Sequence, residues 1–92
     1  MRLLLVEDSL RLQSALGTGL RKAGYVVDVT GDGLEGLWLA ESNDYDTIIL
    51  DLMLPGLDGL SLLRRLRQGA HNQPVIILTA KDAIEDRVRG LG

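Results

Sequence analysis

Thr47-Ile48-Ile49-Leu50-Asp51 is a short apolar run that ends in a carboxylate. A run of this kind, bounded by turn residues, is typical of a buried strand. Similar runs occur at residues 3–6, 26–29 and 75–78. Three of the four runs are apolar almost throughout, as in parallel sheets covered on both faces, whereas residues 26–29 include the polar Asp28. We therefore predict four strands, of which the second lies at an edge of the sheet.

The segment after the first strand carries the spacing of an amphipathic helix. Small and apolar residues recur there at intervals of three and four, which places them along one helix face. Ser9 is a suitable N-cap for this helix and Gly24 a suitable stop. The predicted inward face consists of Leu12, Ala15, Leu16, Gly19, Leu20 and Ala23.

Three further helices are predicted along the chain. Asp32 and Asp58 can each cap a helix, so we interpret Gly31-Asp32-Gly33 and Asp58-Gly59 as turn and cap signals. A last helix is expected to begin near Asp82. Trp38 is expected to pack with its indole N–H near the surface. The residues expected to face the sheet are Leu34, Leu37 and Trp38 in the second helix, Leu60, Leu63 and Leu66 in the third, and Ile84, Val88 and Leu91 in the last.

The alternation of strands and helices predicts an α/β fold. Short connections between such elements imply a parallel sheet with helices on both faces. In open sheets of this class, ligands bind outside the carboxyl ends of the strands, where the strand order reverses. The residues that follow the strands are therefore the first candidates for a functional site.

Composition excludes several classes of protein. The chain has 92 residues, enough for one domain over residues 1–92, and its 46% apolar residues include no Phe. Its net charge of −3 gives no basic surface for nucleic acid. The absence of Cys excludes disulfides and thiolate metal sites, and four apolar residues before Glu7 are too few for a signal peptide or a membrane span. We expect a cytoplasmic protein.

Carboxylates gather at the predicted strand ends. Glu7 and Asp8 follow the first strand, Asp51 follows the third and Thr79 follows the fourth. Three carboxylates in one crevice repel one another unless a hard cation lies among them. Mg²⁺ suits this role, because it binds one or two carboxylates directly and leaves positions for phosphate oxygens.

Asp51 is the predicted nucleophile of a phosphoryl transfer, since aspartate can form an acyl phosphate. The Thr79 hydroxyl and the backbone N–H groups of Met53 and Ala80 are candidate donors to the phosphoryl oxygens. The Met53 thioether does not suit a hard cation, so Met53 would contribute its backbone carbonyl to Mg²⁺. For Asp51 alone, the alternative is a carboxylate that caps a loop.

Three stretches of the chain together resemble the receiver domain of bacterial two-component response regulators. They are Leu3-Leu4-Leu5-Val6-Glu7-Asp8, Ile49-Leu50-Asp51-Leu52-Met53-Leu54-Pro55-Gly56-Leu57-Asp58-Gly59 and Ile77-Leu78-Thr79-Ala80-Lys81-Asp82. The resemblance runs from Met1 to the end of the chain. It is closest to the branch whose full-length members add a winged-helix DNA-binding domain. It implies a flavodoxin-like, doubly wound parallel sheet with strand order 2-1-3-4.

The resemblance also implies a role for each site residue. Asp51 would accept a phosphoryl group from a sensor histidine kinase, and Asp8 and Asp51 would bind Mg²⁺ directly. Glu7 would act largely through water, and Thr79 would sense the phosphoryl group. The chain would then be a phosphoacceptor, not an enzyme, in a phosphorelay that regulates transcription.

The chain also departs from the family pattern. A complete receiver continues with a fifth β-α unit and a Lys that contacts the phosphoryl group, and neither is present in residues 1–92. Lys81 is interpreted as a solvated side chain, and the single His71 has no metal-binding partner. An alternative function is therefore an incomplete receiver that acts as an assembly module. It would form a homodimer through the edge at residues 75–78 or by segment exchange.

A phosphohydrolase resembling the haloacid dehalogenase group is a further alternative. Such enzymes carry a second Asp two residues after the nucleophile, where it acts as acid and base. Met53 occupies that position here and cannot transfer protons. The sequence therefore favours phosphoryl acceptance over phosphate hydrolysis.

Overall fold

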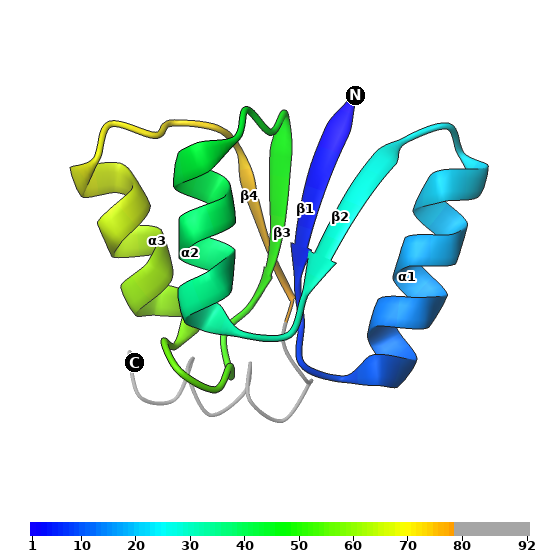
Figure 1. The fold of residues 1–92 in the computed structure, drawn as a ribbon, viewed down its shortest axis with the longest axis horizontal. Coiled ribbons are helices and arrows are strands. Elements are labelled where there is room, and N and C mark those ends of the chain that lie inside the picture. The colour runs from blue at the N-terminus through cyan, green and yellow to red at the C-terminus, as the bar shows by residue number, and fades with distance from the viewer. Residues whose placement is uncertain (79–92) are drawn as a thin grey trace, which may run out of the picture.

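The strands and helices alternate along the chain in the computed structural model, which describes residues 1–78. All four predicted strands and the first three predicted helices are confirmed, and the helix expected near Asp82 lies outside the described residues. The elements are β1 (Arg2–Val6), α1 (Leu10–Lys22), β2 (Val26–Thr30), α2 (Gly33–Ser42), β3 (Thr47–Asp51), α3 (Gly59–Gln68) and β4 (Val75–Leu78) (Figure 1).

The four strands form one parallel sheet in the order β2-β1-β3-β4. This confirms the predicted order and the edge position of β2. In register, Val6 of β1 pairs with Thr30 on one side and with Leu50 on the other, and Asp51 pairs with Leu78. The carboxyl ends of all four strands therefore lie next to one another at the same end of the sheet.

Each of the three helices within residues 1–78 begins directly after its predicted N-cap. The Ser9 hydroxyl accepts a hydrogen bond from the backbone N–H of Leu12 at 3.3 Å. The carboxylates of Asp32 and Asp58 accept from the N–H groups three residues later, at 2.9 and 3.0 Å. These bonds satisfy backbone donors that have no partner within the helix. The helices thus begin at the end of the sheet where the strands finish.

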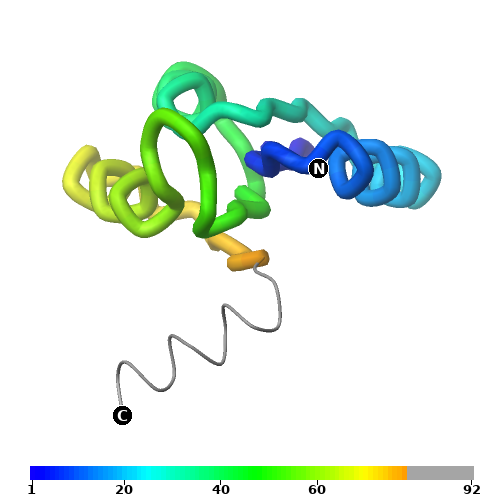
Figure 2. The backbone as a smooth tube through the Cα atoms, turned by 90° about the horizontal axis from the view of Figure 1, so that it is seen from below, coloured from blue at the N-terminus to red at the C-terminus, as the bar shows by residue number. Residues whose placement is uncertain are grey.

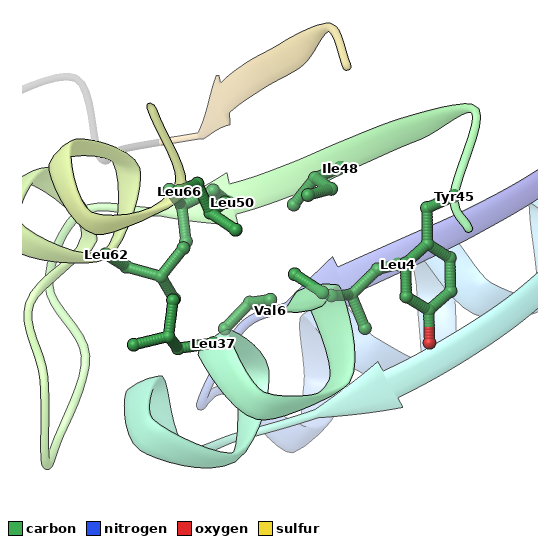
Figure 3. Close-up of a cluster of buried hydrophobic side chains, with 9 residues drawn as sticks. Leu4, Val6, Leu37, Tyr45, Ile48, Leu50, Leu62 and Leu66 are labelled. Carbon is green, nitrogen blue, oxygen red and sulfur yellow. The ribbon is translucent and has the colours of Figure 1, made fainter. Parts of the chain in front are cut away.

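Two groups of side chains cover the two faces of the sheet, because successive residues of a strand point to opposite faces. Leu4 and Val6 point to the face covered by α2 and α3, where Leu37 and Leu62 belong to the same buried cluster (Figure 3). Leu3 and Leu5, with Val27 and Ile49, point to the face on which Leu16 and Leu20 of α1 pack. Figure 2 shows α1 apart from α2 and α3, which lie next to each other.

The predicted inward face of α2 is partly wrong. Leu37 is buried as expected, but Leu34 and Trp38 are 53% and 63% exposed. The buried face consists instead of Gly33, Gly36, Leu37 and Ala40. A Cβ on Gly36 would lie 2.9 Å from a methyl carbon of Val6, so the small residue lets the helix approach β1 closely. In α2, Leu37 and three small residues therefore face the sheet, while Leu34 and Trp38 point outward.

The inward faces of α3 and α1 also differ from the prediction. In α3, Leu66 is buried and Leu63 packs against the core, but Leu60 is 43% exposed and Leu62 is buried in its place. In α1, Leu16 and Leu20 pack against the sheet, whereas the other members of the predicted stripe that lie in the helix are exposed. They are Leu12, Ala15 and Gly19. None of the three described helices combines the length and hydrophobicity needed to cross a bilayer.

Candidate functional site

The three predicted carboxylates meet where β1 and β3 end. Glu7 and Asp8 follow the last residue of β1, and Asp51 is the last residue of the adjacent β3. One oxygen from each carboxylate lies within 4.8 Å of the other two. Within residues 1–78, this is the one group of three or more metal-ligating side chains. The structure therefore brings together the acidic residues that the sequence predicted.

Glu7 is a buried member of this group, with 3% of the residue exposed. Burial raises the pKa of its carboxyl group, and the nearby Asp51 carboxylate raises it further. The N–H of Ser9 donates to Glu7 Oε1 at 3.0 Å and opposes this increase in pKa. A buried acid held beside two other carboxylates is the environment in which a bound cation is most stabilising.

The backbone of Glu7 is held from two directions. Its N–H donates to the carbonyl of Thr30 at 2.9 Å, which links it to β2. Its carbonyl accepts a hydrogen bond from the side-chain amide of Gln13, which reaches across from α1. Gln13 could not be found from the sequence, because nothing in the spacing of α1 distinguishes it from a solvated residue.

Asp51 is held by the loop that follows it. The backbone N–H of Met53 donates to Asp51 Oδ1 at 3.1 Å. Gly59, the first residue of α3, donates its N–H to the carbonyl of Leu52 at 3.0 Å. A Cβ on Gly59 would lie 2.5 Å from the Asp51 carbonyl oxygen, so only glycine allows α3 to begin this close to β3.

A cleft of about 620 Å³ opens over the carboxylates. Its acidic part is formed by the strand ends, and its apolar wall comes from α1 and β4. The lining residues are Glu7, Asp8, Leu12, Leu16, Asp51, Met53 and Leu78. An apolar wall beside charged groups lowers the local dielectric and strengthens their interaction with a cation or an anion.

The structure does not test the remaining residues that were predicted for the site. Thr79 and Ala80 lie outside the described residues, as does Lys81. Leu78, which precedes Thr79, pairs in register with Asp51. His71 lies after α3, where its backbone N–H donates to the carbonyl of Leu66. It is not part of the group of metal-ligating side chains at the strand ends.

A second polar group lies near the amino-terminal ends of β1 and β3 and consists of Arg2, Asp28 and Tyr45. Asp28 accepts hydrogen bonds from Arg2 at 2.8 Å and from the Tyr45 hydroxyl at 2.7 Å. Burial and the bond to Asp28 raise the pKa of Tyr45 to about 12. The Arg2 guanidinium also lies 5.0 Å from the centre of the Tyr45 ring. The three side chains satisfy one another's hydrogen-bonding groups, so we assign them a role in the stability of the fold.

Comparisons with known proteins agree with this geometry. The family described as "Response regulator receiver domain" matches residues 3–92. The chain is 54% identical over 91 residues to the transcriptional regulatory protein HprR of Escherichia coli (strain K12). That alignment covers 99% of this chain and 40% of HprR. The chain thus spans about 40% of the length of the curated relatives that it matches.

Two solved structures are close to the fold described above. The receiver domain of the Francisella response regulator 1452 matches with a TM-score of 0.86 and 40% identity, covering 98% of this chain and 74% of that one. The receiver domain of the sensor histidine kinase PA1611 from Pseudomonas aeruginosa PAO1 matches with a TM-score of 0.85 and 39% identity, covering 94% and 72%. The latter structure has a magnesium ion coordinated in the active site cleft.

Proposed function

Because the chain belongs to the response regulator receiver family, we propose that it accepts a phosphoryl group on Asp51 in a reaction that requires Mg²⁺. The observation that carries this proposal is the meeting of three carboxylate oxygens within 4.8 Å at the ends of β1 and β3. In the reaction, an Asp51 carboxylate oxygen forms a bond to phosphorus as the bond between phosphorus and the donor atom breaks. The product is an aspartyl phosphate.

The residues of the site suit Mg²⁺. All the donors are oxygens, and the buried Glu7 has a raised pKa that a nearby cation would lower. Asp8 and Asp51 would bind the ion directly, the backbone carbonyl of Met53 would add a ligand, and Glu7 would act largely through water. The bound ion would neutralise charge on the phosphoryl oxygens. The magnesium ion in the related PA1611 receiver supports this assignment.

The chain's own donors would orient the phosphoryl group. The Met53 N–H now donates to Asp51 Oδ1, so it already lies where a phosphoryl oxygen on Asp51 could accept its hydrogen bond. Thr79 would donate its hydroxyl and Ala80 its backbone N–H. The chain itself receives the group and keeps it, which distinguishes it from a transferase that releases a product.

A sensor histidine kinase is the proposed donor, and the cytoplasm is the proposed compartment. Relatives such as HprR are named as transcriptional regulatory proteins. We therefore place the chain in two-component signalling that controls transcription. The chain's net charge of −3 makes it a poor ligand for nucleic acid, so DNA binding would belong to a further domain.

A second candidate function is assembly. Ile76 and Ile77 of β4 are both exposed, and β4 lies at the edge of the sheet formed by the described residues. Exposed apolar residues at a sheet edge favour pairing with another strand. A homodimer formed through β4 or by segment exchange would cover them. Sedimentation at micromolar concentration tests this candidate, because a folded monomer would contradict it.

Incubation with Mg²⁺ and acetyl phosphate, followed by intact mass measurement, tests the proposed acceptor. The wild-type chain should gain one phosphoryl group, and Asp51→Asn should gain none. Asp44→Asn is a matched control, because Asp44 is an exposed aspartate outside the carboxylate group. It should react like the wild type. An equal adduct on Asp51→Asn would show that another residue is the acceptor.

A further inference from the structure

The turn that opens α2 is in backbone contact with the loop that follows Asp51. The N–H of Gly33 donates to the carbonyl of Pro55 at 3.1 Å. A Cβ on Gly33 would overlap the Leu57 carbonyl oxygen and lie 2.7 Å from the Leu57 carbonyl carbon. Both neighbours are backbone atoms, which cannot rotate away as a flexible side chain can. A residue larger than glycine would therefore displace the loop.

A second contact joins the same two segments. Gly56 has a φ of 80°, and a Cβ on it would overlap Asp32 Oδ1. The Pro55 carbonyl accepts from Leu57 N–H as well as from Gly33, which closes a tight turn at the middle of the loop. The Asp32-Gly33 turn and the Pro55-Gly56 turn thus fit against each other, and each requires glycine at the point of contact.

These contacts lead directly to the phosphoacceptor. The loop between β3 and α3 contains Met53, whose N–H holds Asp51. Its beginning is fixed where Gly59 donates to Leu52, and its middle is fixed by Gly33. Thr30, at the end of β2, connects the same turn to Glu7. Its carbonyl accepts a hydrogen bond from the N–H of Glu7, and its hydroxyl accepts one from the N–H of Asp32. The start of α2 is therefore connected to both sides of the carboxylate group.

We propose that Gly33 is a positioning residue for the Asp51 site, because it fixes the loop that places the Met53 backbone beside Asp51. This inference rests on the proposed function, since it assigns Gly33 a role in metal binding and phosphoryl acceptance. A purely structural role would require only that Gly33 stabilise the fold. The two roles differ in what happens to metal affinity in a variant that remains folded.

The test compares Gly33→Ala with Gly19→Ala. Gly19 is an exposed glycine within α1, and a Cβ on it would meet no atom within 4 Å. Binding of Mn²⁺, used as a probe for Mg²⁺, is measured by loss of the free-ion electron paramagnetic resonance signal. Supporting groups around a metal site typically change affinity by about 10- to 100-fold. We expect binding at least about tenfold weaker in Gly33→Ala, and unchanged binding in Gly19→Ala.

The phosphorylation rate at saturating Mg²⁺ supplies a second readout. Because Met53 also orients Asp51, the rate in Gly33→Ala should stay below that of the wild type even when metal is saturating. Wild-type affinity and rate in folded Gly33→Ala would overturn the inference while leaving the proposed function intact. A wild-type chain that binds no Mn²⁺ and gains no phosphoryl group would overturn both.

A milder pair of variants covers the case in which Gly33→Ala does not fold. Leu57 and Leu63 are both partly buried leucines that pack against the same core cluster, but only Leu57 lies in the loop. Leu57→Ala loosens the loop at the point that Gly33 contacts, whereas Leu63→Ala creates a comparable loss of packing in α3. We expect weaker Mn²⁺ binding in Leu57→Ala alone. Equal affinities in the two variants would contradict the inference.

Discussion

Glu7→Gln should stabilise the metal-free protein at neutral pH. In the wild type, the buried Glu7 carboxylate lies beside Asp51, with oxygens within 4.8 Å of each other. Burial of the charged carboxylate is the first cause of its raised pKa, and two unit charges at that distance repel by about 3 kcal/mol at an effective dielectric constant of about 20. The Ser9 N–H donates less strongly to an amide than to a carboxylate, which offsets about 1 kcal/mol. The expected increase in the free energy of unfolding is about 2 kcal/mol.

The pH dependence of this increase follows from the direction of the pKa shift. The pKa of Glu7 is raised in the folded protein above its usual value of 4.5, so the folded state binds this proton more tightly than the unfolded state. Wild-type stability should therefore fall as the pH rises above about 4.5 and through the raised pKa. Glu7→Gln lacks this fall. The two proteins should have similar stability near pH 4 and differ fully above the raised pKa.

Urea unfolding in the presence of a chelator, at several pH values, measures this difference. Glu41→Gln is the matched control, because Glu41 is exposed on α2, and it should follow the wild type. Saturating Mg²⁺ should reverse the order, since a cation stabilises the wild-type carboxylates more than the variant's amide. A variant that is less stable than the wild type without metal at neutral pH would refute the argument that Glu7 is destabilising.

Three other predictions concern the fold. Leu62 is fully buried and Trp38 is 63% exposed, so Leu62→Ala should lower the free energy of unfolding by about 2 to 5 kcal/mol and Trp38→Ala should change it by less than about 0.5 kcal/mol. Equal losses of stability in chemical denaturation would contradict this difference in burial. Gly36→Ala should cost about 1 to 2 kcal/mol, because overpacking against Val6 exceeds the gain in helix propensity; a stabilised variant would mean that α2 can shift. The Tyr45 phenol should ionise only near pH 12, so its stabilising contribution is present below about pH 10 and is lost as the pH rises toward 12; ultraviolet titration in which every tyrosine ionises near pH 10 would contradict this.

The strands could be predicted from the sequence because a strand buried on both faces is apolar whichever way it points. Residues 3–6 and 47–50 are of this kind and needed no information about their neighbours, whereas residues 75–78 are equally apolar but are partly exposed at the edge of the described sheet. The helix caps were equally local, since each aspartate or serine contacts an N–H three residues away. Predictions that depended only on contacts close in the sequence were therefore confirmed.

The inward faces of the helices depended on how closely each helix approaches the sheet. In α2, the spacing of Leu34 and Trp38 indicated a face that the structure leaves exposed. The deciding residue is Gly36, whose missing side chain lets the helix pack against Val6. A count of hydrophobic residues gives glycine no weight, so this face could not be found from hydrophobicity alone.

The site shows the same division. Glu7, Asp8 and Asp51 could be predicted because strand ends in a parallel sheet align by topology. Gln13 and Gly33 could not, because each acts through a tertiary contact with a backbone that is distant in the sequence. The roles of Thr79 and Ala80 stay predictions, since both lie outside the described residues.

The carboxylate group and the core depend on the same strand register. Leu50 is fully buried against α2 and α3, and it pairs with Val6, the residue before Glu7. A slip of one residue between β1 and β3 would turn Leu50 to the opposite face and move Asp51 by about 3.3 Å along its strand. The burial of Leu50 therefore opposes any slip that would relieve the repulsion between Glu7 and Asp51. The core therefore opposes separation of the acidic residues, and we expect a bound Mg²⁺ to offset their repulsion.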